Sequence, residues 1–193
     1  MNYLDELNEA QRAPVVHKDG PVMVIAGAGS GKTRVLTYRI AYLMQQGVDP
    51  FNILALTFTN KAAREMKERI MKLVDPNEAR NVWMGTFHSI FARILRIEAQ
   101  RIGFTSNFTI YDTDDSKALI NQILKDKELD TKVYPAKMVL SRISAAKSSL
   151  YSPEEYLEDA GIQETDLKSG KPLIGQIFKI YNERLHLSNA MDF

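Results

Sequence analysis

The residues with the clearest chemical meaning form the run Ala26-Gly27-Ala28-Gly29-Ser30-Gly31-Lys32-Thr33. Glycines at this spacing let backbone N–H groups turn towards an anion, while a lysine reaches the β- and γ-phosphates and a threonine hydroxyl ligates Mg²⁺. Ala26 stands where the strict pattern has its first glycine, whereas Gly-Lys-Thr is intact. The run predicts a phosphate-binding loop, with an ordinary turn between a strand and a helix as the alternative.

The segments on either side of this run favour phosphate binding. Residues 22–26 are apolar, which predicts a strand, and a helical pattern runs from Lys32 to about Gln46. A strand before the loop and a helix after it form the context that phosphate binding requires, because the helix directs its positive end at the anion. We therefore predict that residues 26–33 bind a nucleotide, with Lys32 and Thr33 as the catalytic pair and Thr33 as the Mg²⁺ ligand.

Short apolar runs alternate with helical patterns throughout residues 1–110. Residues 53–58 precede a helix that Asn60 would cap, and residues 82–86 precede a helix that reaches about Arg101. This alternation predicts an α/β fold with a parallel sheet, helices on its faces and ligands beyond the carboxyl ends of the strands. Residues 111–193 show only helical patterns and predict a separate, all-helical domain, with helices at residues 113–127, 135–147, 153–159 and 175–187. Asp112 would cap the first of these helices, and Ser152 begins a capping box before the third.

A second group of candidate residues follows the two later predicted strands, in Thr57-Phe58-Thr59-Asn60 and Gly85-Thr86-Phe87-His88-Ser89. An aromatic ring beside small polar residues can stack on a nucleobase while the polar groups contact phosphate. Burial of Phe58 in the core is the alternative, because most aromatic residues at strand ends are buried. For His88 the alternative is a structural histidine, and the spacing of the three histidines suggests no metal site.

The composition restricts the class of protein. The chain has 193 residues with 45% hydrophobic residues, a formal net charge of +1 and no cysteine. These values are typical of a globular protein, exclude disulfides and give no apolar run of membrane-spanning length. The acidic amino terminus does not resemble a signal peptide, so we expect a cytoplasmic protein without a membrane partner.

Four stretches of the chain form motifs in a fixed order. They are Leu7-Asn8-Glu9-Ala10-Gln11, the phosphate loop continuing through Leu36, residues 54–66 and residues 85–89. In this order they resemble the motifs of superfamily 1 DNA helicases of the UvrD/Rep/PcrA type. Similarity continues through residues 143–147 and 191–193, so the resemblance covers essentially the whole chain.

The resemblance implies a role for each motif. Gln11 would recognise the adenine of ATP through its amide donor and acceptor, and Arg34 would lie beside the nucleotide. A larger set of residues would face single-stranded DNA, namely Phe58, Thr59, Asn60, Thr86 and His88. The resemblance further implies a RecA-like P-loop domain called 1A in residues 1–110, a helical insertion called 1B in residues 111–193 that meets the junction with duplex DNA, and ATP-driven 3′ to 5′ movement in DNA repair or replication.

Phosphoryl transfer needs groups that this chain does not supply convincingly. A second carboxylate must hold Mg²⁺, a residue must orient the attacking water, and an arginine must stabilise the γ-phosphate. We therefore expect a fragment that lacks ATPase activity, exposes apolar surface at its incomplete sheet and self-associates. A P-loop kinase of small molecules and a non-catalytic nucleic-acid-binding module remain the alternatives to the helicase.

Overall fold

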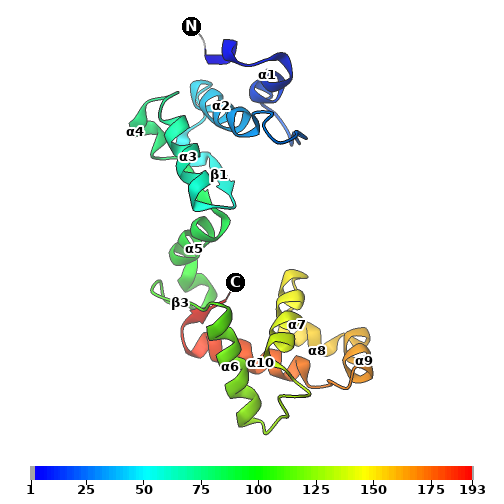
Figure 1. Ribbon diagram of the computed structural model, residues 1–193. Coiled ribbons are helices and arrows are strands. Elements are labelled where there is room, and N and C mark those ends of the chain that lie inside the picture. The colour runs from blue at the N-terminus through cyan, green and yellow to red at the C-terminus, as the bar shows by residue number, and fades with distance from the viewer. Residues whose placement is uncertain (1–2, 193) are drawn as a thin grey trace. The chain divides into compact units, whose positions relative to one another are not determined.

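The computed structural model describes residues 3–192, which form two compact units on either side of the Ile94–Leu95 bond (Figure 1). This division precedes the predicted domain boundary at residue 110. Both units are mainly helical, and each contains one parallel sheet of two strands. The chain is therefore a mixed α/β protein, and each unit is described separately below.

The amino-terminal unit contains the predicted phosphate loop. Its elements are a 3₁₀ helix Tyr3–Glu6, α1 (Glu9–Val16), α2 (Lys32–Gln45), a 3₁₀ helix Pro50–Asn52, β1 (Leu54–Thr57), α3 (Asn60–Ile70), α4 (Pro76–Ala79), β2 (Trp83–Thr86) and the first part of α5 (Phe87–Glu98). The predicted end of the first helix near Gln46 is confirmed, and Gly47 follows it with a φ of 84° that favours glycine.

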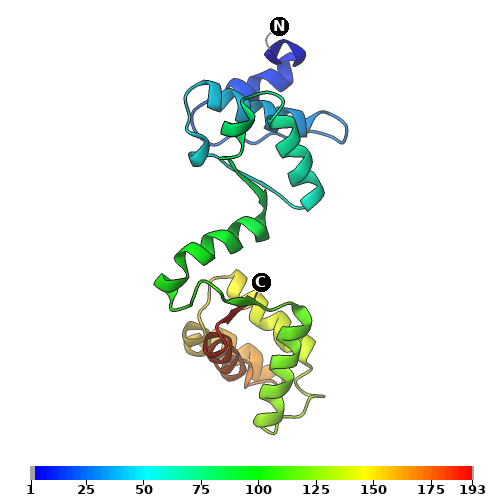
Figure 2. The ribbon, with the colours of Figure 1, turned by 90° about the vertical axis from the view of Figure 1, so that its left-hand side faces the viewer.

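Strands β1 and β2 pair in parallel, with Leu54 opposite Trp83 and Thr57 opposite Thr86. Apolar side chains from α2, β1 and α3 pack together as Ile40, Ala55 and Met66, so helices cover the strands. Parallel pairing confirms the predicted sheet for these two strands. It also places the carboxyl ends of both strands side by side, and Figure 2 shows α5 beginning where β2 ends.

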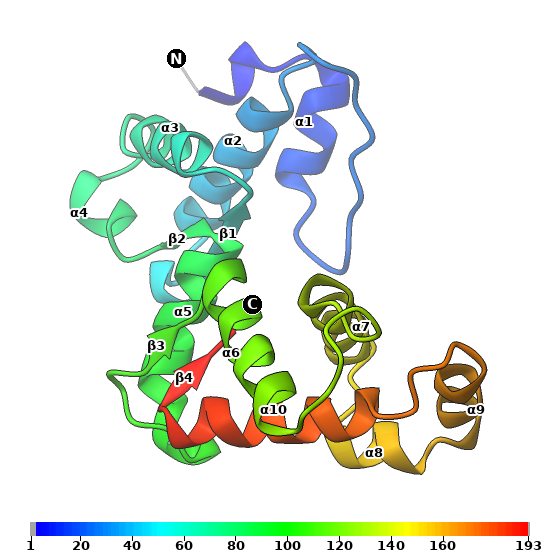
Figure 3. The same ribbon diagram turned by 60° about the horizontal axis from the view of Figure 1, so that its bottom comes forward.

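The predicted strand at residues 22–26 is wrong. This segment belongs to an open loop between α1 and α2, and Met23 and Ile25 are 82% and 87% exposed (Figure 3). A single strand is unstable without a neighbour that satisfies its backbone hydrogen bonds, and no described residue pairs with this segment. The loop thus exposes apolar side chains, whereas apolar surface at an incomplete sheet and self-association stay predictions.

The start of α3 also differs from the expectation. Thr59, not Asn60, is the N-cap residue, because its Oγ1 accepts a hydrogen bond from the Ala62 N–H at 3.1 Å. Asn60 is already the first helical residue. Threonine and asparagine both cap well, so composition did not distinguish these neighbouring positions.

The carboxyl-terminal unit carries the predicted helices and one that was not predicted. After a 3₁₀ helix Ala99–Ile102 come β3 (Thr109–Ile110), α6 (Thr113–Asp126), α7 (Ala136–Ser148), α8 (Pro153–Glu158), α9 (Ala160–Lys168), α10 (Ile174–Leu187) and β4 (Ala190–Met191). The expectation of an all-helical second part is wrong, because β3 and β4 pair in parallel (Figure 3). Two-residue strands are too short to produce an alternating pattern in sequence.

Local capping explains where the helices of this unit begin. Asp112 caps α6 and Ser152 caps α8, each in a reciprocal arrangement with the residue three positions later. Hydrogen bonds from the backbone N–H groups of Asp115 and Asp114 lower the pKa of Asp112, and the Ser152 N–H lowers that of Glu155. Ile120, Ile143 and Phe178 belong to the buried core that joins the helices.

Candidate nucleotide and nucleic-acid site

The phosphate loop turns through two glycines that have positive φ. Gly29 has a φ of 78° and Gly31 a φ of 88°, a backbone conformation that side chains disfavour. Gly31 is the N-cap residue of α2, and the Ser30 hydroxyl donates to the Gly27 carbonyl at 2.7 Å. The loop is thus closed by its own hydrogen bonds directly before the positive end of α2.

Gln11 joins α1 to this loop. Its Nε2 donates to the Ser30 carbonyl at 2.9 Å, and its Oε1 accepts from the Asn8 N–H at 3.3 Å. The Asn8 side chain in turn accepts from the Gln11 backbone N–H at 2.9 Å. A Cβ on Gly31 would lie only 2.8 Å from Gln11 Nε2, so the absence of a side chain at Gly31 permits this contact.

Lys32 lies at the first turn of α2 and bends over the loop. Its Nζ donates to the Ala26 carbonyl at 2.9 Å and to the Gly27 carbonyl at 2.6 Å. The structure therefore places the ammonium group beside the glycine-rich turn, although residues 22–26 are not a strand. An ammonium group and a helix amino terminus at one turn together favour an anion.

A cavity of about 500 Å³ opens at the loop. It is lined by Gln11, Gly29, Ser30, Gly31, Lys32, Thr33, Arg34 and Arg69. Three of these side chains are cationic and none is a carboxylate, so the donor set fits a polyphosphate. For Mg²⁺ the lining offers only the Thr33 hydroxyl, which fits a metal ion whose other ligands are phosphate oxygens and water.

Arg69 is a lining residue that sequence reasoning missed. It lies in the last turn of α3 and forms a 3.7 Å ion pair with Glu65, in which both side chains are about half exposed. Arg34 and Arg69 also line an adjoining cavity of about 360 Å³ with Tyr38. No spacing in the sequence indicated Arg69, because only the packing of α3 beside α2 brings it to the loop.

The candidate DNA-binding residues lie at the ends of β1 and β2. Phe58 follows β1 and is 89% exposed, so the alternative that it is a core residue is wrong. Its ring centroid lies 5.4 Å from that of Phe87, the first residue of α5. The Thr57–Thr86 register brings these two rings together.

The polar members of this group differ in their surroundings. Asn60 and His88 are exposed near the starts of α3 and α5. The Thr59 hydroxyl is used as an N-cap, and Thr86 is only 8% exposed, with its Oγ1 donating to Ser89 Oγ at 3.0 Å. Thr59 and Thr86 therefore have structural partners at the helix starts.

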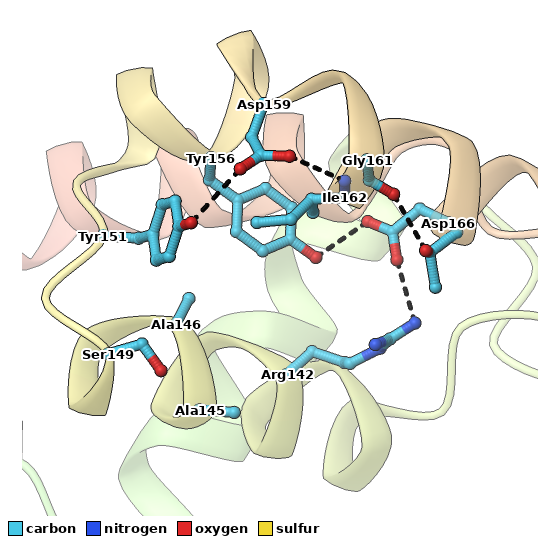
Figure 4. A pocket seen from close by; sticks show the side chains of 11 residues that line it. Arg142, Ala145, Ala146, Ser149, Tyr151, Tyr156, Asp159, Gly161, Ile162 and Asp166 are labelled. Carbon is cyan, nitrogen blue, oxygen red and sulfur yellow. Dashed lines mark hydrogen bonds and ion pairs between the residues drawn. The ribbon is translucent and has the colours of Figure 1, made fainter.

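A further cavity, of about 360 Å³, lies among α7, α8 and α9 of the carboxyl-terminal unit (Figure 4). Asp166 is 1% exposed there and accepts from Arg142 Nη2 at 2.9 Å and from the Tyr156 hydroxyl at 2.7 Å. Burial, followed by the hydrogen bond to Asp166, raises the pKa of Tyr156. The Tyr151 hydroxyl donates to Asp159 at 3.1 Å. These groups partner one another, which is typical of a structural cluster.

Within residues 3–192, no helix combines the length and apolar character needed to cross a membrane.

Comparison with known proteins gives consistent matches. Residues 7–193 match the family described as the UvrD/REP helicase N-terminal domain. The chain is 46% identical over 191 residues to the ATP-dependent DNA helicase PcrA of Staphylococcus aureus, which covers 98% of this chain and 25% of the relative. Identity to PcrA of Bacillus subtilis is 45% over 199 residues, covering 100% of this chain and 26% of that protein. The chain thus spans about a quarter of the length of the curated relatives it matches.

Proposed function

Because the chain belongs to the UvrD/REP helicase N-terminal domain family, we propose that it is the ATP- and single-stranded-DNA-binding portion of an ATP-dependent 3′ to 5′ DNA helicase. The observation that supports this most directly is the cavity at the phosphate loop, where Gln11, Lys32 and Arg34 meet. The relatives are called ATP-dependent DNA helicases, which fits a cavity with these donors.

In this proposal different residues at the loop bind different parts of ATP. Lys32 leaves the carbonyls of Ala26 and Gly27 for the β- and γ-phosphates, and the backbone N–H groups of the loop bind the same anion. Thr33 would hold Mg²⁺ through its hydroxyl oxygen, and the bound ion would screen the charge of the triphosphate. Gln11 exchanges its bond to Ser30 for the adenine edge, and Arg34 lies beside the nucleotide.

We propose that this chain by itself binds ATP but does not turn it over. The loop cavity has no carboxylate among its described lining residues. Hydrolysis requires a carboxylate to hold Mg²⁺ and a group that orients water, so binding without turnover is expected.

For DNA, the exposed ring of Phe58 would stack on a base while Asn60 and His88 face the strand. Thr59 and Thr86 would contribute through their positions at the helix starts, where backbone N–H groups can contact phosphate. Residues 111–193 would correspond to the helical 1B insertion and meet the duplex at the junction. The candidate substrate is therefore single-stranded DNA next to a duplex.

The nucleotide part is tested by titrating the chain with ATP and with GTP by isothermal calorimetry. We expect binding of ATP in preference to GTP, loss of that binding in Lys32→Ala, and no change in Lys18→Ala, a lysine outside the cavity lining. Phosphate release with single-stranded DNA present should stay at background. Equal binding by wild type and Lys32→Ala would contradict the loop assignment, and rapid turnover would contradict the proposed lack of hydrolysis.

A further inference from the structure

Three phenylalanine rings form an exposed row at the end of β1 and along the first turns of α5. The centroids of Phe58 and Phe87 lie 5.4 Å apart, and those of Phe87 and Phe91 lie 6.5 Å apart with an angle of 18° between the ring planes. The side chains of Phe58, Phe87 and Phe91 are 89%, 40% and 46% exposed. We call these residues the phenyl row.

The phenyl row is not part of a buried core. Ile90, the neighbour of Phe91 in the chain, is 5% exposed and lies on the inner side of α5. Phe87 and Phe91 are four residues apart, so they occupy one outer face of the helix. Phe58, the candidate base-stacking residue, lies next to this face, because its ring contacts that of Phe87.

A cation follows Phe58 in the chain, whereas the arginines of α5 have partners within the protein. Arg93 lies over the Trp83 ring, and Arg96 donates to backbone carbonyls. On the β1 side, α3 begins with Asn60 and Lys61. Aromatic rings next to cations are typical of surfaces that bind single-stranded nucleic acid, because rings stack on bases while cations neutralise phosphates.

We infer that the phenyl row is a continuous stacking surface, in which Phe87 and Phe91 extend the contact of single-stranded DNA beyond Phe58. This inference rests on the proposed function and adds two residues to its DNA site. Each of the three rings keeps exposed surface, which a base of the same strand can contact. Contact through π-faces is tolerant of base identity, so the row would bind strands of different sequence similarly.

The test measures binding of a fluorescein-labelled oligothymidylate by fluorescence anisotropy at low salt. Loss of one stacked base corresponds to about 5- to 150-fold weaker binding, which is the effect we expect for Phe91→Ala and for Phe58→Ala. The matched control is Phe51→Ala, which removes a phenylalanine that is 62% exposed outside the row and should leave affinity unchanged. Thermal melting of each variant, followed by Trp83 fluorescence, identifies any loss of folding.

A second variant separates stacking from apolar contact. Phe91→Leu keeps an apolar side chain but removes the aromatic face, so stacking predicts a loss close to that of Phe91→Ala. Full affinity in Phe91→Leu, or in Phe91→Ala, would overturn the inference while Phe58→Ala still weakens binding. If wild type does not bind the oligonucleotide, or if Phe58→Ala also has no effect, the proposed DNA-binding function itself fails.

Discussion

Replacing Gly31 by alanine tests how the phosphate loop is held. The φ of 88° at Gly31 costs an alanine about 1–2 kcal/mol. The added Cβ would also lie 2.8 Å from Gln11 Nε2, so the end of that side chain must move away from the Ser30 carbonyl. Loss of this hydrogen bond adds about 0.5–1.5 kcal/mol, which gives a total of about 1.5–3.5 kcal/mol.

Two other variants divide this total into its parts. Gly20 has a φ of 77° and no atom within 4 Å of a built Cβ, so Gly20→Ala should cost only the backbone strain of about 1–2 kcal/mol. Gln11→Ala should cost about 1–3 kcal/mol through the loss of two hydrogen bonds, one to the Ser30 carbonyl and one from the Asn8 N–H. In the double variant Gly31→Ala with Gln11→Ala the steric contact is absent, so the combined loss should be smaller than the sum of the two single losses.

The assay is urea unfolding followed by tryptophan fluorescence. Trp83 is the single tryptophan and lies in β2, so its emission reports on the amino-terminal unit that contains the loop. The Arg93 guanidinium lies 4.3 Å from the Trp83 ring centroid, a contact that unfolding removes. The reasoning is refuted if Gly31→Ala costs no more than Gly20→Ala and if its effect adds fully to that of Gln11→Ala.

Three further predictions concern capping, burial and pH. Thr59→Ala should lower the free energy of unfolding of the amino-terminal unit by about 1 kcal/mol, measured by Trp83 fluorescence, whereas Thr59→Ser should retain the cap. Asp166→Ala should destabilise the carboxyl-terminal unit by about 2–3 kcal/mol, because the buried Tyr156 hydroxyl and the Arg142 guanidinium lose a charged partner; circular dichroism at 222 nm follows the loss, and unchanged melting would contradict the assigned cluster. The folded-state pKa of Asp112 is lowered, so its stabilisation is present above its unfolded pKa of about 4 and is lost as the pH falls through the folded value. In an acid titration by circular dichroism, Asp112→Asn should keep the cap without titrating and lose less helix than wild type; equal losses would contradict this assignment.

Much of the helical structure could be predicted because it depends on neighbouring residues. The start of α6 at Asp112 and that of α8 at Ser152 follow from caps that bond to backbone groups within three residues. The glycine-rich loop before α2 could be located for the same reason, since its glycines and Lys32 are close together in the chain. Helix α9 was missed although Asp159 caps it, because it begins directly after α8.

Contacts between distant segments could not be predicted in the same way. An apolar run at residues 22–26 suits a strand, yet a strand forms only when another segment supplies the paired backbone groups. Arg69 reaches the loop cavity through the packing of α3, and the pairing of β3 with β4 joins residues far apart in the chain.

The sequence by itself determined the starts of α6 and α8, the glycine-rich loop before α2 and the family resemblance, because each depends on residue types at short, fixed spacings. Only the tertiary structure decided that Phe58 is exposed beside Phe87, since that depends on the register of β1 with β2. It likewise decided that Gln11 bonds to Ser30, because α1 must pack near the loop before the two residues can meet. The physical reason is that chain neighbours set local conformation, whereas burial and exposure are set by every segment that packs around a residue.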